Sequence, residues 1–467
     1  MNIFKWNNNT KSNQTVIPTS NEIQFRKYVL TAPINKILLS IGIPLVIYQI
    51  VNQLFKLLDI FMAAQIGSIE VGAVTYLSQL SLIVQAIATG ISLAGGIKLS
   101  EEYGREDYTK LRETIGGLIS LVFFISAFIL FLIPLTDTIL IIAKTPVDFI
   151  KVGRFYFIIQ LLTLVFIFFN SIYLSIEGAA GHSMKILIIN LSVLVSKAVL
   201  TYFFTFILKT GITMIAIAGL ISQLIPFIFF IIFFLDKNKA FSLSLRDIKP
   251  KSNIIFPLLK LAIPLSSEKF LFAFGKVIIN TLMTAFNPLM ISAFGISDTI
   301  TGINAVSYNG FQSAAASCIS QSLGANNKKR ALSIFYFNIL LNVIIGLAMI
   351  IPSILFAPQI MEIFVKSNDE FLEFLQSIYY KDLFSTLPLA INSAVLALFY
   401  GFGKTKFSLI INSARIYAFR IPVLWLLSNF TSLGNNSIGY MLIISNVSTS
   451  ILGLFLAHIF ILGKQNK

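Results

Sequence analysis

The second half of this sequence repeats landmarks of the first half at a constant spacing of 220 positions. The matches run without a gap and place Pro44 on Pro264, Lys56 on Lys276, Ala73 on Ala293, Gly90 on Gly310, Ser100 on Ser320 and Gly104 on Gly324. A constant offset across landmarks this far apart indicates two halves of one internal repeat rather than two unrelated domains. In a strongly apolar chain, such a repeat is typical of a membrane transporter whose halves rock about a shared site.

The composition excludes a soluble globular protein. Hydrophobic residues make up 56% of the chain, charged residues only 12%, and the mean hydropathy is +0.84. Two stretches, 115–135 and 211–235, contain no charge and are each long enough to cross a bilayer. The polar N-terminal segment precedes every apolar run, so it is interpreted as a tail rather than as a cleavable signal peptide.

The apolar runs and the turn residues between them predict an all-α integral membrane protein. We expect twelve transmembrane helices, at roughly 36–64, 70–98, 114–142, 151–177, 184–206, 211–235, 256–284, 288–321, 331–357, 375–401, 407–428 and 438–462. They would form two six-helix bundles, 34–236 and 254–463, related by a pseudo-two-fold axis along the membrane normal. Residues 1–33 would be a flexible cytoplasmic tail, and the polar segment 237–253 a cytoplasmic linker.

The distribution of Lys and Arg predicts the orientation. Most of these residues fall in the tail, the linker and the alternate loops that lie on the same side, which places both termini in the cytoplasm. The net charge of +15 is spread over short loops beside helix ends, so we expect anionic lipid headgroups rather than nucleic acid as its partner. We expect a monomer in a bacterial inner membrane that handles a small-molecule substrate.

Neither metal chemistry nor catalysis is expected. Cys318 is the single cysteine, which excludes an intramolecular disulfide, and the two histidines leave no zinc or haem constellation. An intramembrane enzyme or insertase would need a catalytic serine, a paired aspartate or a metal cluster, whereas His182 and His458 are isolated. The chain is therefore predicted not to be an enzyme and to use no cofactor or metal.

Five motifs, taken in order, resemble the multidrug and toxic compound extrusion (MATE) transporters of the MOP flippase superfamily. They are the run from Pro44 to Asp59, the glycine-rich stretch 90–107, its counterpart 311–327, the turn 401–405, and Arg415 with the segment 420–422. The resemblance covers about 34–463. It implies a secondary-active exporter of small amphipathic compounds that works by alternating access.

Ionisable residues inside the predicted spans are the candidate site residues, because a charge near the bilayer centre costs roughly 2.5 to 3.5 kcal/mol. The strongest is Asp59, three residues after Lys56 and so on the same helical face. Asp59 could couple transport or bind substrate, and the alternative is a structural ion pair. Arg415 and Arg420 lie towards the cytoplasmic part of their helix, where long side chains can snorkel to the interface. The remaining candidates are Asn52, Asn190, Lys197, Glu268, Lys269, Lys276 and Asp298.

The chain also departs from the family pattern. Many MATE transporters carry an asparagine and, four residues later, an aspartate in helix 5. Counted from Asn190, these positions hold Val193 and Lys197. The acidic residues that some sodium-coupled members use would fall near Phe272 and Leu389, so no sodium site is expected in the second half.

Two mechanisms follow from these departures. Lys197 beside Asp59 would stabilise the carboxylate and oppose its protonation, so proton coupling requires the pair to separate during the cycle. Alternatively, Lys56, Lys197 and Lys276 could neutralise an anionic or lipid-linked substrate, as in a flippase. We predict an antiporter with the proton as coupling ion, sodium being the other candidate.

Overall fold

The computed structural model describes residues 20–64, 66, 68–143, 145–235, 251–283, 288–364, 369–434 and 436–463. Within these residues twelve long helical segments follow one another, several of them interrupted. The first half contains α2 (Ile34–Ala64), α3 (Ser68–Gly104), α4 (Tyr108–Leu132) with α5 (Thr136–Ile142), α6 (Val147–Ala179), α7 (Ser183–Tyr202) and α8 (Ile212–Leu235). The second half contains α9 (Ser252–Met283), α10 (Pro288–Gly324), α11 (Lys328–Leu355) with α12 (Ala357–Phe364), α13 (Asp369–Gly401), α14 (Thr405–Ala414), the π-helix η4 (Arg415–Arg420), α15 (Ile421–Phe430) and α16 (Asn436–Ala457). The predicted all-α architecture is confirmed.

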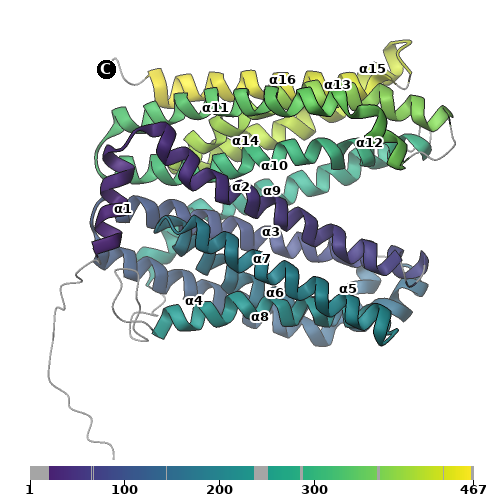
Figure 1. Cartoon of the computed structure of the whole chain (residues 1–467), viewed down its shortest axis with the longest axis horizontal. Helices are drawn as coiled ribbons and strands as arrows, with labels where there is room; N and C mark the ends of the chain where they lie inside the picture. The colour runs from purple at the N-terminus through teal and green to yellow at the C-terminus, as the bar shows by residue number, and fades with distance from the viewer. Residues whose placement is uncertain are drawn as a thin grey trace, which may run out of the picture.

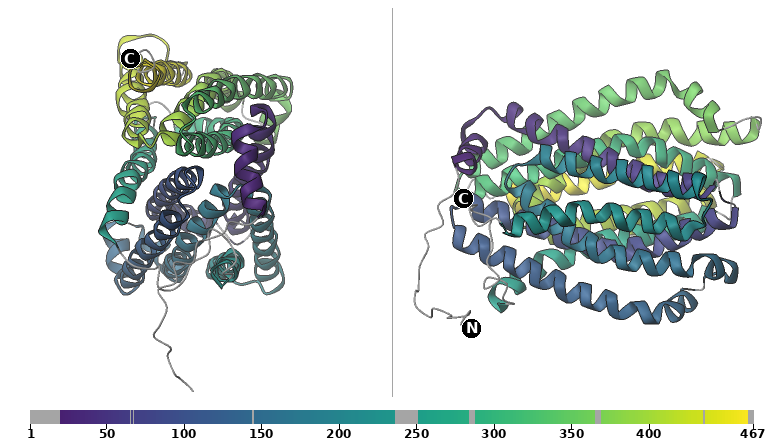
Figure 2. Two further views of the ribbon diagram at one scale, coloured as in Figure 1. Left: turned by 90° about the vertical axis from the view of Figure 1, so that its left-hand side faces the viewer. Right: turned by 60° about the horizontal axis from the view of Figure 1, so that its bottom comes forward.

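The helices form two lobes. In Figure 1 the blue and teal helices of the first half lie below the green and yellow helices of the second half, and the end-on view of Figure 2 separates the same two groups. At the seam between the lobes, the first long helix of each half packs against helices of both halves. Helix α2 packs against α7 of its own half and α10 of the other, whereas α9 packs against α14 of its own half and α3 of the other. Each pairing has its counterpart in the other half.

The repeat is visible in individual contacts between glycine and backbone. A Cβ added at Gly90 would lie 2.5 Å from the amide nitrogen of Ser266, and one added at Gly310 would lie 2.6 Å from that of Val46. Both residues of the second contact are displaced by 220 positions from those of the first. Only glycine lets the helix backbones approach this closely where lipid provides no hydrophobic drive for association. The small residues of the repeat therefore serve inter-lobe packing.

The turns that end α3 and α10 repeat as well. Glu106 and Asn326 both adopt the left-handed region, with φ of 62° and 57°, which is uncommon for residues other than glycine. The next residues, Asp107 and Asn327, each accept a hydrogen bond from the backbone N–H three residues on, at 3.1 and 3.0 Å. These are N-caps of α4 and α11. The two halves thus share the geometry of their turns as well as their helix order.

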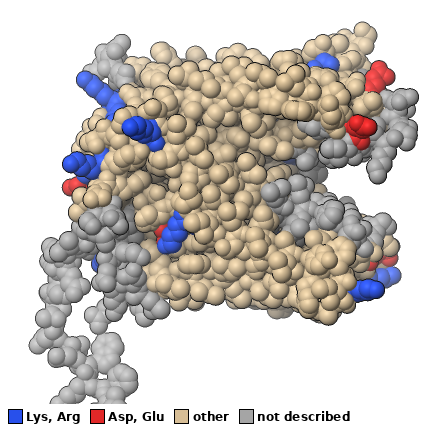
Figure 3. Space-filling model, viewed as in Figure 1, with Lys and Arg blue, Asp and Glu red and all other residues tan. Residues whose placement is uncertain are grey.

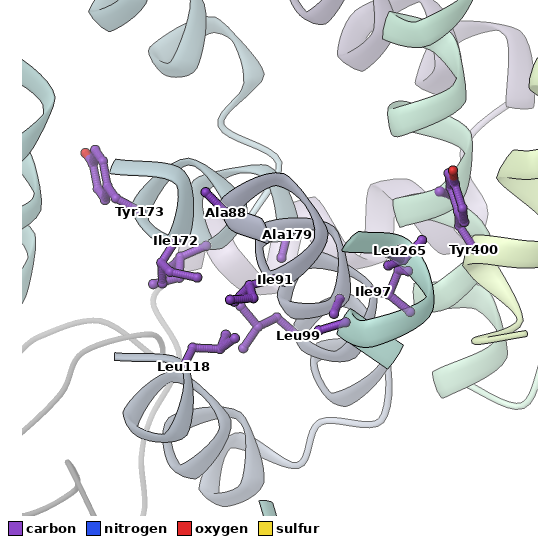
Figure 4. Close-up of a cluster of buried hydrophobic side chains, with 14 of the residues drawn as sticks. Ala88, Ile91, Ile97, Leu99, Leu118, Ile172, Tyr173, Ala179, Leu265 and Tyr400 are labelled. Atoms are coloured by element: carbon purple, nitrogen blue, oxygen red, sulfur yellow. The ribbon is translucent and has the colours of Figure 1, made fainter. Parts of the chain in front are cut away.

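The core crosses the seam, and the outer surface is apolar. Figure 4 places Leu265 of α9 next to Ile97 of α3, with Leu118 and Ile172 packed on the other side of α3. Among the described residues, ten helices are long and apolar enough to cross a membrane. Charged side chains gather at the two ends of the molecule and leave a broad apolar belt between them (Figure 3). Such a belt fits the hydrocarbon layer of a bilayer.

The N-terminal segment differs from the prediction. Residues 1–19 lie outside the described part, but residues 20–31 form a helix, α1 (Ser20–Thr31), where a flexible tail was expected. Tertiary contacts stabilise it: Val29 is fully buried, and Arg26 donates to the carbonyl oxygen of Gly104 at 2.9 and 3.2 Å and pairs with Glu106 at 2.6 Å. Most of the predicted linker, 237–253, lies outside the described residues, and α9 begins within it at Ser252.

Helix α1 joins the two lobes at the left-hand end of Figure 1. Arg26 binds the turn after α3 in the first half. Arg330, from α11 in the second half, donates to the carbonyl oxygens of Val29 and Ala32 at 2.7 and 2.6 Å. Arg26 of α1 therefore attaches this short helix to the first half, and Arg330 of α11 attaches it to the second half. Any motion that separates the lobes at this end must break one of these attachments.

Arg330→Ala is expected to loosen α1 without unfolding the lobes. The change removes two charge-assisted hydrogen bonds to backbone carbonyls, each contributing about 1.5 to 3 kcal/mol. Hydrogen–deuterium exchange of the amides in residues 23–32 should accelerate by about tenfold or more. Lys329→Ala, which removes a neighbouring exposed charge, is the control and should leave exchange unchanged. Equal exchange in wild type and Arg330→Ala would mean that α1 is held elsewhere.

Candidate functional site

The first half offers a partial view of its predicted site. The side chains of Lys56 and Asp59 lie outside the described residues. Lys197 of α7 is buried, with 2% of its surface exposed. Asn190 donates to the carbonyl oxygen of Ile186 on its own helix at 2.8 Å, and Asn52 is half-buried on α2. Because α2 and α7 are packing partners, Lys197 lies on a helix that faces the predicted Asp59 helix. The Asp59–Lys197 pair stays a prediction.

The second half brings two of the predicted residues into direct contact. Lys276 of α9 donates to both carboxylate oxygens of Asp298 on α10, at 3.1 and 2.8 Å. Both were named as candidates from the sequence, and the structure brings them together. The side chains keep 36% and 45% of their surface exposed. Since exposure of these charges to lipid is costly, we expect their exposed surfaces to face water rather than lipid.

A second carboxylate lies deeper in the same lobe. Asp382 of α13 is buried and accepts hydrogen bonds from the hydroxyls of Ser297 at 2.8 Å, Thr301 at 2.9 Å and Ser385 at 3.2 Å. Ser297 precedes Asp298 on α10, so the two carboxylates occupy adjacent positions on facing helices. Three hydroxyl donors stabilise a buried carboxylate without adding charge.

Arg420 connects this carboxylate pair to α16. Its guanidinium donates to Ser445 at 3.3 Å and to Asn446 at 3.2 Å, and it lies within electrostatic range of both Asp298 and Asp382. Asn446 in turn donates to the hydroxyl of Ser385 at 2.9 Å, which also binds Asp382. Arg420 is buried, so the prediction that it snorkels to the interface is wrong.

Arg415 begins the π-helix η4, and its environment differs from that of the other cations. Its guanidinium lies 4.4 Å from the ring centroid of Phe272, and Lys276 lies 5.6 Å from the same centroid. Pro422 explains the widened helical turn, because its ring would crowd the carbonyl of Ala418 in a regular α-helix. π-Helical turns inside α-helices frequently occur at functional sites.

Glu268 forms a separate polar cluster. It is almost fully buried and accepts hydrogen bonds from Lys269 at 2.9 Å, from the Tyr400 hydroxyl at 2.9 and 3.2 Å, and from Asn412 at 2.8 Å. These donors come from α9, α13 and α14. The cluster therefore links three helices of the second half, and the Glu268 carboxylate accepts hydrogen bonds from each of them.

Asp382 is the residue that the sequence reasoning missed. The family pattern directed attention to Phe272 and Leu389, but the structure has a buried carboxylate two helical turns before Leu389 and another, Glu268, one turn before Phe272. The sequence analysis named Glu268 and Asp298 but not Asp382, and whether this half binds sodium stays a prediction. A charged residue inside a predicted span was the available signal, since Asp382 lies within the span predicted at 375–401.

Taken together, Lys276, Arg415 and Arg420 lie within electrostatic range of Asp298 inside one lobe, and Arg420 lies within range of Asp382 as well. Three positive and two negative charges leave one positive charge in excess. Part of the cluster is accessible, as the exposures of Lys276 and Asp298 indicate. A partly accessible, nearly balanced group of charges within membrane-spanning helices is suited to binding ions or charged groups as the lobes move.

Comparison with known proteins agrees with this architecture. The MatE family model matches residues 44–203 and 264–426, one match in each half of the repeat. The multidrug resistance protein YoeA of Bacillus subtilis, named as probable, is 22% identical over 404 residues, which are 84% of this chain and 86% of that protein. The multidrug export protein MepA of Staphylococcus aureus is 23% identical over 278 residues, 58% of this chain and 60% of that protein.

Solved structures share the fold. One, described as the outward-facing conformation of a multidrug resistance MATE family transporter of the MOP superfamily, has a TM-score of 0.89 at 19% identity and covers 97% of this chain and 100% of its own. Another, a MOP superfamily transporter from Pyrococcus furiosus Vc1 whose description reports a binding pocket of reverse polarity, has a TM-score of 0.87 at 19% identity, with 95% and 98% covered.

The fold and the charged cluster define a two-lobed membrane transporter rather than an enzyme. The chain belongs to the MatE family.

Proposed function

We propose that the protein exports small amphipathic compounds by alternating access, in exchange for protons. One observation carries the proposal: the lobes are locked together at the α1 end, while Figure 3 shows the molecule hollowed between them at the opposite end. Closure at one end with an opening at the other is what one state of an alternating-access cycle requires. The names of the relatives, which refer to multidrug resistance and export, support the same substrate class.

The orientation proposed for the molecule makes this state outward-facing. The positive-inside rule assigns α1 and the turns after α3 and α10 to the cytoplasm, together with both termini. The cytoplasmic end would then be the closed one. One chain holds both lobes and the complete charged cluster, which supports a monomer as the working unit.

Purified protein in proteoliposomes tests the function. A pH gradient and a sodium gradient are imposed separately, with a panel of cationic and anionic amphipathic dyes that includes ethidium and fluorescein. The proposal requires at least one dye to accumulate and the pH gradient to be the gradient that drives it. Transport driven only by sodium would replace the proton by sodium as coupling ion. No gradient-driven transport of any dye would overturn export of amphipathic compounds.

Asp59→Asn is expected to abolish transport driven by the pH gradient, because it removes the one carboxylate of α2 and leaves Lys197 charged. Asp59→Asn combined with Lys197→Met removes the orphan charge. If Asp59 carries the proton, the double variant should fold with the thermal stability of wild type and still fail to couple. Asp148→Asn, which changes an exposed carboxylate, is the control. Full pH-driven transport by Asp59→Asn alone would rule out this role.

A further inference from the structure

Arg415 forms no direct ion pair with a carboxylate of the described residues. No carboxylate oxygen of the described residues lies within 4.0 Å of its guanidinium, and its buried Nε has no hydrogen-bond partner among them. The carboxylates in electrostatic range, Glu268 and Asp298, are already bound by Lys269 and Lys276. A guanidinium with an unsatisfied, buried Nε–H inside a membrane protein calls for an anionic partner that is not part of the lobe.

The position of Arg415 is fixed by tight packing. A Cβ on Gly275 of α9 would lie 2.2 Å from Cγ2 of Ile416, so η4 rests directly on α9. The hydroxyl of Tyr417 donates to the carbonyl oxygen of Leu271 at 2.9 Å and holds the same two helices together. The guanidinium therefore stays over the Phe272 ring, where stacking leaves its planar donor edge available. A pre-positioned guanidinium loses little entropy when it binds.

The surroundings favour an oxyanion over a cation. Arg415 and Lys276 lie over the same Phe272 ring, so a ligand there meets two positive charges and an aromatic face. Arginine binds carboxylates and phosphates through two parallel hydrogen bonds. A cationic group at the same place would be repelled by the excess positive charge.

We propose that Arg415 is the anchor for an oxyanion, a carboxylate or a phosphate, carried by an amphipathic molecule whose apolar part packs on Phe272. The proposal rests on the proposed function and specifies its substrate class. The oxyanion could belong to a soluble compound or to a lipid headgroup. Lys276, paired with Asp298, is the second cation of the site and strengthens the local field.

A matched pair of dyes tests the site by equilibrium binding, independently of transport. Fluorescein and rhodamine 123 share the same ring system, but at pH 7.5 the first is an anion and the second a cation. Fluorescence anisotropy with the purified full-length protein should show fluorescein binding that weakens by about tenfold or more in Arg415→Gln, or about 1.4 kcal/mol. Rhodamine 123 binding should stay unchanged or tighten.

Two further variants complete the test. Arg415→Lys keeps the charge but not the paired hydrogen bonds. Its affinity for fluorescein should therefore lie between those of wild type and Arg415→Gln. Arg154→Gln, at an exposed arginine paired with Asp137, should bind like wild type. Fluorescein affinity within twofold of wild type in Arg415→Gln, or an equal loss for both dyes, would overturn the proposal. Gradient-driven export of ethidium could still succeed in that case.

The source of the oxyanion follows from competition in mixed micelles. If phosphatidylglycerol displaces fluorescein from wild type and phosphatidylcholine does not, a lipid phosphate is the occupant. If neither lipid displaces it, the site serves soluble anions. Both results retain the oxyanion chemistry at Arg415.

Discussion

Gly104→Val is expected to abolish transport and to open the seam between the lobes at the α1 end. A Cβ at Gly104 would lie 2.2 Å from the carbonyl oxygen of Gln321, and one at Gly324 would lie 2.1 Å from that of Glu101. The obstacles are backbone atoms of the opposite lobe, which cannot move aside without separating α3 from α10. Because this close contact closes the molecule at the α1 end, a larger side chain there should prevent the state in which that end is closed.

Cys318 provides the measurement. It is the single cysteine of the chain, it is fully buried on α10, and its neighbour Ser317 contacts Ser100 of α3 at 2.9 Å. A maleimide should label Cys318 at least about tenfold faster in Gly104→Val than in wild type, since opening the seam exposes it. Gly302→Val is the matched control on the same helix as Gly324, because a Cβ there meets nothing within 4 Å. Wild-type transport by Gly104→Val would mean that this contact is dispensable.

The repeat explains why so much of the fold was predictable. The constant offset between repeated glycines predicted the two halves, and the apolar runs predicted the long helices. What was not predicted is α1. Its sequence is polar and has no apolar stripe, so its helical state depends on Arg26, Arg330 and the burial of Val29, contacts with partners 78 to 301 positions away in the sequence. Periodicity carries no information about such contacts.

The candidate site was predictable in its residue types but not in its pairing. Lys276 and Asp298 were identified as intramembrane charges, and the repeat placed them on neighbouring helices, but their direct contact depends on helix rotation. Arg420 illustrates the limit more clearly. Its position near a helix end suggested snorkelling, whereas the π-turn before Pro422 and the partners Ser445 and Asn446 keep it inside the lobe. A local change of helical geometry cannot be derived from spacing alone.

Asp382→Asn is expected to abolish gradient-driven transport while the protein still folds. The asparagine amide can accept from and donate to the hydroxyls of Ser297, Thr301 and Ser385, which rotate to suit, so the hydrogen bonds survive in altered form. The negative charge does not survive. The cluster would then hold three cations against Asp298 alone, so it would bind anions more tightly and cations more weakly than in wild type.

A comparison of Asp382→Leu with Asp382→Asn separates the effect of the hydrogen bonds from the effect of the charge. Asp382→Leu removes both, and leaving buried polar groups without partners costs about 1 to 3 kcal/mol for each group. The thermal midpoint in detergent should therefore fall clearly for Asp382→Leu and much less for Asp382→Asn. Asp137→Asn, an exposed carboxylate paired with Arg154, is the control for both measurements. Equal midpoints for the two Asp382 variants would show that the hydroxyls do not depend on this carboxylate.

Arg420→Gln in the Asp382→Asn background decides what the carboxylate does. The double variant restores the excess of one positive charge, now as Lys276 and Arg415 against Asp298. If Asp382 serves only to balance Arg420, transport should return to within about tenfold of wild type, because the remaining charges are compensated as before. If Asp382 itself takes up and releases the coupling ion, the double variant should reach the thermal midpoint of wild type and remain inactive under every imposed gradient. Wild-type transport by Asp382→Asn alone would contradict both roles, and would leave the Lys276–Asp298 pair as the part of the lobe on which coupling depends.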